Sequence, residues 1–350
     1  MRKIVAMGMI LLALVLAACS AGGSATDEPP VIRLMTHDSF DMSAELLDDF
    51  EAETGIRVEV FKAGDGGEIL NKAILSKDAP LADVLFGVDN TFLSRALDND
   101  LFLPYDSPIL ADIADSLKLD PQNRVLPVDF GDVCLNYDVS WFAGRGLAPP
   151  DSLADLADPA YAGLTVVENP ATSTPGLGFL LTTIDAFGED GYLDYWARLV
   201  DNDVLVVDGW ETAYYSHFTA ASEGDRPIVV SYAGSPAAEV YYAETPPDEA
   251  PTAAVLTDGT CFRQIEFVGI LRGTQKEKEA RQLVDFLLDR PFQEDIPLKM
   301  FVYPANETAV LPDVFQQYSQ TPAAPVQLDP SRITANREAW IQAWTEIVLR

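Results

Sequence analysis

A helix is expected to begin within the segment ENPATSTPGLG, residues 168–178, which contains three consecutive hydroxyl-bearing residues. We expect Thr174 to be the N-cap of this helix and Pro175 its first residue, because proline favours that position. Such a helix start leaves backbone N–H groups free and presents the positive end of the helix dipole. With added hydrogen bonds from Thr172 and Ser173, the turn up to Gly176 could bind a phosphate or a hydroxyl group. A capped helix start without a ligand is the alternative.

Carboxylates and aromatic rings that could bind a cation occur in several predicted loops. Asp38 and Asp65 each follow a predicted strand, and Asp129 is a third candidate. An isolated loop aspartate more often caps a turn, so Asp129 carries little weight. Trp210 and Tyr232 offer ring faces, over which a cation gains about 0.5–2 kcal/mol. An aromatic residue at a helix start is, however, more often part of the core.

Patterns that indicate catalysis or a metal centre are missing from the sequence. The two histidines, His37 and His217, cannot supply a zinc site with the usual ligand spacings. There is no GxSxG elbow, no P-loop and no dinucleotide-binding GxGxxG motif. The 55 acidic residues provide carboxylate pairs by chance, and none stands out. We therefore expect a binding protein rather than an enzyme, with no catalytic residues, no metal and no cofactor.

Alternating strands and helices are predicted to position these residues. Strand-like segments at 31–35, 56–60 and 84–86 alternate with helices, which indicates an open α/β sheet. Such sheets bind ligands in the loops beyond the carboxyl ends of their strands, where Asp38, Asp65 and Asp89 lie. A second α/β unit begins near Val128. Its expected strands are 134–137, 164–167, 204–207 and 228–231, with helices after Thr174, Asp190 and Gly209.

The last third of the chain predicts one more strand and two amphipathic helices. A long apolar strand is expected at 262–271. Thr274 and Glu277 would then form a capping box at the start of a helix with an apolar stripe. A final helix carries Trp340 and Trp344 on an apolar face suited to docking.

The first thirty residues predict export and a lipid anchor. A basic start leads into an apolar run that is shorter than the roughly 20 residues of a membrane span. Small residues precede Cys19, as in the bacterial lipobox, so we expect a signal peptide over residues 1–18 and a lipidated Cys19. Residues 19–30 are typical of a flexible tether. A plain cleavable signal that ends near Ala18 is the alternative.

The net charge of −32 limits the partners of the protein. Nucleic acids and anionic lipid surfaces require clustered Lys and Arg, whereas a cationic small molecule would be attracted. A well-solvated surface, adapted to a salty or acidic habitat, is the alternative explanation. We expect a monomer outside the cytoplasm that contacts the membrane only through its lipid anchor.

Cys134 and Cys261 lie in apolar, strand-like segments. Outside the cytoplasm two thiols tend to form a disulfide, but two buried small side chains fit the sequence equally well.

Taken together, these motifs resemble the periplasmic thiamine-binding proteins of ABC importers, which belong to a broader group of binding proteins that includes ferric-iron carriers. The STPGLG run carries the resemblance, and further matches follow in the same order over most of the mature chain. They are Thr36, Asp38–Phe40, Ala82–Val84, Gly87, Asp89–Asn90, Pro127, Asp129, Gly131, Tyr137–Asp138, Gly209–Trp210, Ala213–Tyr214, Ser231–Tyr232, Ser235–Ala237, Tyr303–Pro304 and Arg337–Trp344.

The resemblance implies a type II periplasmic-binding-protein fold, in which two α/β lobes are joined by crossing strands and the ligand binds in the cleft. Closure around the ligand would be a hinge motion. We place the crossings near Val128 and Ile265. Lobe 1 would then comprise residues 31–128 and 265–303, and lobe 2 residues 129–264 and 304–350.

The resemblance also implies capture of thiamine or a thiamine phosphate and delivery to ABC permease subunits. The helix turn would bind the hydroxyethyl or phosphate tail, and Trp210 and Tyr232 correspond to aromatic residues that contact the ligand in the family. Carboxylates would balance the thiazolium. The predicted ligand-binding residues are His37, Asp38, Asp65, Thr172, Ser173, Thr174, Gly176, Trp210, Tyr232 and Phe301.

The sequence departs from the family pattern around the pyrimidine ring. His37 and Ala238 stand where tyrosines are usual, and Phe301 replaces a tryptophan. His37 can still stack on a ring, and a tyrosine at 241 or 242 could reach in. Because the two usual tyrosines sandwich the pyrimidine, the alternative is a protein of the same class for another ligand, such as ferric iron, a polyamine or a pyrimidine.

A secreted enzyme such as a thiaminase is the alternative from another class. It needs an activated cysteine nucleophile. Cys134 lies inside an apolar strand and Cys261 faces no evident base, so this alternative fits poorly.

Overall fold

The computed structural model describes residues 29–64 and 66–350, so the predicted signal peptide, Cys19 and Asp65 lie outside the described part. The strands are β1 (Val31–Thr36), β2 (Arg57–Lys62), β3 (Val84–Asp89), β4 (Phe102–Leu103), β5 (Leu126–Asp138), β6 (Thr165–Glu168), β7 (Leu205–Val207), β8 (Ile228–Tyr232), β9 (Thr252–Ala254), β10 (Phe262–Leu271) and β11 (Tyr303–Pro304). The helices are α1 (Ala44–Thr54), α2 (Gly66–Leu75), α3 (Leu93–Asp98), α4 (Val139–Arg145), α5 (Thr174–Asp201), α6 (Trp210–Thr212), α7 (Ser235–Tyr242), α8 (Glu277–Leu288), α9 (Arg290–Lys299), α10 (Asp313–Tyr318) and α11 (Pro330–Val348).

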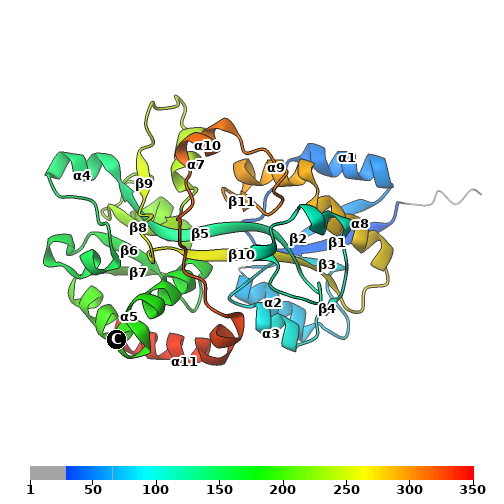
Figure 1. Cartoon of the computed structure of the whole chain (residues 1–350), viewed down its shortest axis with the longest axis horizontal. Helices are drawn as coiled ribbons and strands as arrows, with labels where there is room; N and C mark the ends of the chain where they lie inside the picture. The colour runs from blue at the N-terminus through cyan, green and yellow to red at the C-terminus, as the bar shows by residue number, and fades with distance from the viewer. Residues whose placement is uncertain (1–28, 65) are drawn as a thin grey trace, which may run out of the picture.

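Two lobes lie side by side, and the strands β5 and β10 run from one lobe into the other (Figure 1). The strands follow the order β2-β1-β3-β10-β5-β8-β6-β7 in one continuous sheet. β5 and β10 pair antiparallel along most of their length, with Asp129 opposite Glu266 and Gly131 opposite Gln264. The crossings predicted near Val128 and Ile265 therefore lie in these two strands.

The first lobe is built around parallel strands. β1 pairs in parallel with β2 and with β3, as expected for a β-α-β-α-β unit. Its apolar core takes residues from 32 to 128 and again from 265 to 305, which includes the apolar face of α8. Gly55 ends α1 in the left-handed conformation with φ of 71°, which glycine adopts without steric cost.

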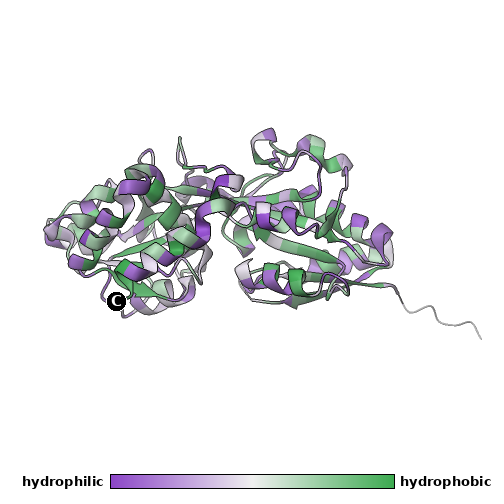
Figure 2. Ribbon diagram, turned by 90° about the horizontal axis from the view of Figure 1, so that it is seen from below, coloured by the Kyte–Doolittle hydropathy of each residue, from purple (hydrophilic) through white to green (hydrophobic). Residues whose placement is uncertain are grey.

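The second lobe has its own core, which spans residues 133 to 262 and 326 to 344. β6 pairs in parallel with β7 and β8, and α5 packs against α11. Trp196 of α5 meets Trp344 of α11 edge to face, with ring centroids 5.4 Å apart. Figure 2 shows apolar residues along the strands inside both lobes. These separate cores agree with the two predicted lobes, whose boundaries remain a prediction.

The helix starts differ from the predictions because tertiary contacts engage the capping residues. Thr274 does not form a capping box with Glu277. Its hydroxyl donates to Asp83 at 2.6 Å, and Lys276 is the N-cap of α8. Ser43 is the N-cap residue of α1, but its hydroxyl donates to Asp295 at 2.7 Å and makes no capping hydrogen bond.

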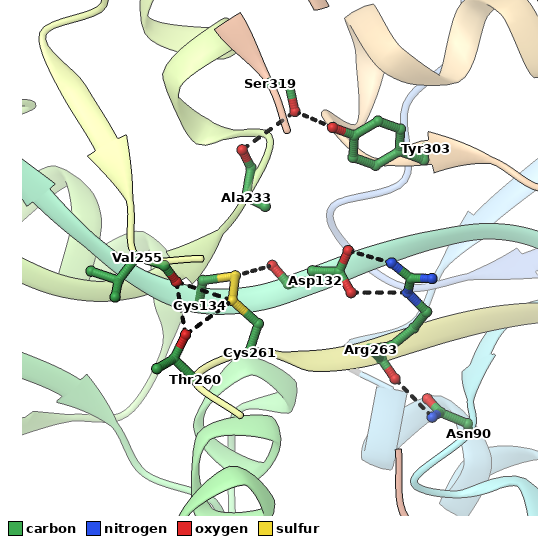
Figure 3. A network of polar contacts seen from close by, with 10 residues as sticks. All are labelled: Asn90, Asp132, Cys134, Ala233, Val255, Thr260, Cys261, Arg263, Tyr303 and Ser319. Carbon is green, nitrogen blue, oxygen red and sulfur yellow. Dashed lines mark hydrogen bonds and ion pairs between the residues drawn. A yellow bond between two sulfur atoms is a disulfide. The ribbon is translucent and has the colours of Figure 1, made fainter. Parts of the chain in front are cut away.

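Cys134 and Cys261 form a disulfide that joins β5 to the residue before β10 (Figure 3). Both residues are fully buried. Of the two possibilities that the sequence left open, the structure therefore has the bonded one.

Within residues 29–64 and 66–350, no helix combines the length and apolar character required to span a bilayer.

Candidate functional site

Four side chains form a polar track along the strands that join the two lobes. The Tyr232 hydroxyl donates to Oε1 of Gln264 at 2.9 Å, and the Gln264 amide donates to Oε1 of Glu266 at 3.3 Å. His37 ends the track, with its Nε2 3.4 Å from Oε2 of Glu266. The track therefore connects the end of β8 in lobe 2 with the end of β1 in lobe 1, and passes over the crossing strand β10.

Two glycines make room for the rings at the ends of this track. A Cβ on Gly87 would lie 2.3 Å from Cδ2 of His37, so the absence of a side chain lets the imidazole cross β3 toward Glu266. A Cβ on Gly131 would lie 2.9 Å from Cδ1 of Tyr232. Gly87 also has φ of 98°, a conformation that other residues adopt at a cost.

We expect Gly87→Ala to lower the free energy of unfolding by about 1–3 kcal/mol, because it adds left-handed strain to a clash with His37. Gly191→Ala is the matched control. Gly191 lies inside α5, and its Cβ would meet Phe187 at an ordinary 3.6 Å. Alanine should be neutral or stabilising there by up to about 1 kcal/mol. Urea denaturation measures both, and equal stability of the two variants would contradict the packing described.

Asp129 and Glu266 share one proton beneath the track. Burial and the neighbouring Glu266 raise the pKa of Asp129 well above its usual value, and Asp129 is hydrogen-bonded to Glu266. Burial alone would raise the pKa of Glu266 as well. The charge of His37 and hydrogen bonds from His37, Asp129 and Gln264 outweigh this effect and hold the pKa of Glu266 below its usual value. The pair therefore carries one negative charge, on Glu266.

An aromatic group borders the track in lobe 2. Trp210 is half-buried, and its indole N–H donates to Oγ of Ser231 at 2.8 Å. Its ring stacks on Tyr214 with centroids 5.1 Å apart and meets Tyr215 edge to face. Trp210 is thus held near the carboxyl end of β8 through Ser231, the residue before Tyr232.

The helix turn lies at the carboxyl end of β6, with its N-cap one residue earlier than predicted. Ser173, not Thr174, is the N-cap of α5, and its hydroxyl accepts from the Gly176 N–H at 3.4 Å. The prediction was wrong because two residues in the run can cap, and Thr174 is instead the first helical residue. Thr172 is exposed, and its hydroxyl donates to the Asp208 carbonyl at 2.7 Å.

Gly176 lies against the end of β6, where a Cβ would come within 2.6 Å of the Glu168 carbonyl oxygen. The fully buried carboxyl of Glu168 precedes the turn, and burial raises its pKa well above the usual value. Burial therefore favours the neutral form of Glu168 at the start of α5.

Other predicted residues lie at the edges of this region. Asp38 is exposed, and its carboxylate accepts a hydrogen bond from the Gly64 N–H at 3.0 Å. This is the turn-capping role that the sequence analysis gave as the alternative to cation binding for a loop aspartate. Phe301 is half-buried, and its ring lies 5.2 Å from that of Tyr242. Asp65 is not described. Within the part of the chain that is described, no group of three or more His, Cys, Asp or Glu side chains could hold a metal ion.

Sequence reasoning missed Gln264 and Glu266. The segment 262–271 was interpreted as an uninterrupted apolar strand, although Gln264 and Glu266 are two residues apart and must point to the same face. Two polar residues on one face of a buried strand were the available signal. Asp129 was also undervalued, because it lies inside β5 opposite Glu266 rather than in a loop.

Comparison with known proteins gives one family and consistent relatives. The family model described as bacterial extracellular solute-binding protein matches residues 79–320. The thiamine-binding periplasmic protein of Escherichia coli is 29% identical over 326 residues, which cover 92% of this chain and 94% of that protein.

Solved structures support the same fold. A structure described as a periplasmic thiamin binding protein superposes with a TM-score of 0.79 at 26% identity, over 92% of this chain and 97% of that one. A ferric binding protein from Campylobacter jejuni shares the fold with a TM-score of 0.74 at 16% identity, over 90% and 99% of the two chains. The predicted two-lobed type II periplasmic-binding-protein fold is thereby confirmed.

Proposed function

Because this chain belongs to the bacterial extracellular solute-binding protein family, we propose that it captures thiamine or a thiamine phosphate outside the cytoplasm and delivers it to an ABC permease. It would act as a binding protein and not as an enzyme. The predicted lipid anchor at Cys19 would keep it at the membrane. The similarity to thiamine-binding proteins over nine-tenths of the chain motivates the choice of ligand.

One observation carries this proposal: the carboxylate of Glu266 on β10 lies 3.4 Å from Nε2 of His37 and is hydrogen-bonded through Gln264 to Tyr232. A flat ligand with a fixed cation fits such a site, because its charge would replace that of His37 beside the carboxylate while aromatic rings cover its faces. Trp210 adds an indole at the same edge of lobe 2. The turn before α5 would receive the tail of the ligand through its hydroxyl and N–H groups.

Thiamine is expected to quench the fluorescence of Trp210 with a midpoint below about 1 µM, which corresponds to a binding free energy beyond about −8 kcal/mol. The quench should disappear in Trp210→Phe. It should persist in Trp141→Phe, since Trp141 lies in α4 under the guanidinium of Arg145. A flat titration of the wild-type chain, or a quench that survives in Trp210→Phe, would count against the proposal.

A ferric-iron carrier is the alternative within the family. Such carriers use paired tyrosines, and Tyr241 and Tyr242 are both exposed with ring centroids 5.2 Å apart. Their rings pack near Phe301, and no His, Asp or Glu group suited to a metal accompanies them among the described residues. Thiamine therefore remains the proposed ligand.

A further inference from the structure

Two arginines from different lobes line one hollow. Arg95 belongs to α3 in lobe 1 and Arg337 to α11 in lobe 2. The hollow has a volume of about 400 Å³, and the turn Pro170–Thr174 forms part of its wall together with Phe92. The same two arginines also line a neighbouring hollow of about 370 Å³.

Arg337 packs against an aromatic ring, and the carboxylate with which it forms an ion pair is exposed. Its guanidinium carbon lies 4.1 Å from the centre of the Phe92 ring, and its side chain is 12% exposed. Its ion pair is with Glu338 at 3.0 Å, and the Glu338 side chain is 84% exposed and therefore strongly screened. Within the described part of the chain, Nε of Arg337 is buried and has no hydrogen-bond acceptor.

Arg95 is without a carboxylate partner among the described residues. Its Nη2 donates to the neutral amide oxygen of Asn71 at 2.6 Å. Glu68, the nearby acidic residue on α2, lies 3.6 Å from Lys72 instead. Two like charges thus share the hollow. Burial lowers the pKa of Arg337 and the charge of Arg95 adds to this effect, whereas the charges of Glu338 and Asp89 oppose it. This is unusual in a chain with 55 acidic and 23 basic residues.

The rest of the wall combines two carboxylates with donors from the start of α5. Glu68 and Glu338 line the hollow beside the two guanidinium groups. Ser173 and Thr174 are buried there at the start of α5, whose first helical segment runs to the break at Gly188 and whose first N–H groups have no partners within the helix. Burial raises the pKa of Glu168, directly before the turn, and favours its neutral form. Phosphate oxygens accept well from guanidinium groups, and a helix start adds further donors.

We propose that this hollow binds the phosphate group of the ligand between Arg95 and Arg337, so that the chain prefers a thiamine phosphate to thiamine. This inference rests on the proposed function and specifies its ligand. A phosphate held between arginines of both lobes also stabilises the closed arrangement, because it contacts the two halves at once. Binding involves no covalent step.

Calorimetric titration of the full mature chain with thiamine, thiamine monophosphate and inorganic phosphate tests this proposal. We expect the monophosphate to bind about 10-fold more tightly than thiamine, as a few charge-assisted hydrogen bonds allow. Arg337→Gln and Arg95→Gln should each remove most of this preference and leave thiamine affinity unchanged. Arg95 is half-exposed, so its variant keeps the test available if Arg337→Gln folds poorly.

Arg332→Gln is the matched control, because Arg332 lies on the same helix, pairs with Glu189 at 3.1 Å and does not line the hollow. It should keep the full preference. Inorganic phosphate should compete with thiamine monophosphate for the hollow. If the chain binds inorganic phosphate and the monophosphate at the same time, the hollow is a site for free phosphate and the proposal is overturned. Thiamine bound without any preference for its phosphate also overturns it. Failure of both thiamine forms to bind contradicts the proposed function itself.

Discussion

Glu266→Gln is expected to weaken thiamine binding by about 2–4 kcal/mol, or roughly 30- to 700-fold, because it removes the charge that balances the thiazolium. Glutamine keeps the size and one acceptor oxygen of the side chain, so the hydrogen bond from Gln264 can persist. A loss of thiamine affinity would therefore result from the missing negative charge and not from a change in the shape of the side chain. Calorimetric titration of the wild-type and variant chains with thiamine measures the difference.

Asp129→Asn is the control for this prediction. Asp129 lies opposite Glu266 in the adjacent strand and is fully buried, and burial and the charge of Glu266 raise its pKa and favour its neutral form. Asparagine should therefore change thiamine affinity by less than about 1 kcal/mol. Equal losses in both variants would mean that the pair serves the packing of the crossing strands and that another group balances the ligand charge.

Loss of the disulfide between Cys134 and Cys261 is expected to produce the largest change in stability. The bond closes a loop across a sequence separation of 127 residues, for which chain entropy predicts a contribution of about 5 kcal/mol. Measured effects of native disulfides are typically about 2–5 kcal/mol. A Cys134→Ala and Cys261→Ala double variant should therefore lose about 2–5 kcal/mol of unfolding free energy. Urea denaturation, in which the variant should unfold at a lower concentration, measures this loss.

A reducing agent provides the control. It should destabilise the wild-type chain to nearly the level of the double variant and leave the double variant unchanged. Thiol titration in denaturant verifies that reduction is complete. A fully reduced wild-type chain with unaltered stability would show that the bond contributes nothing to folding.

Local sequence patterns predicted the elements well. The alternation of Ile56, Val58 and Val60 predicted β2, and the helical stripe up to Leu288 predicted α8. The two helices expected after Thr174 and Asp190 form the single element α5, which Gly188 interrupts with φ of 72°. These features depend on neighbours in the sequence, and periodicity reports them directly.

The helix starts and the charge of the site depend on residues far apart in the sequence. Thr274 could cap α8, but its hydroxyl donates a hydrogen bond to Asp83, which is 191 residues away in the sequence. Glu266 gains its role only because Gly87 lets His37 reach it across β3 and because Asp129 lies opposite. The resemblance supplied His37 and Tyr232 as candidates, whereas the carboxylate between them required the register of β5 and β10.

We expect the cleft to select a flat organic cation with the dimensions of thiamine. Native mass spectrometry of the mature chain, mixed with equimolar thiamine, spermidine and ferric citrate, tests it most directly. We predict one thiamine retained per chain in the wild-type protein and a strongly reduced fraction in Glu266→Gln. Retention of spermidine or iron in its place, or a chain that stays unliganded in the mixture, would contradict the account.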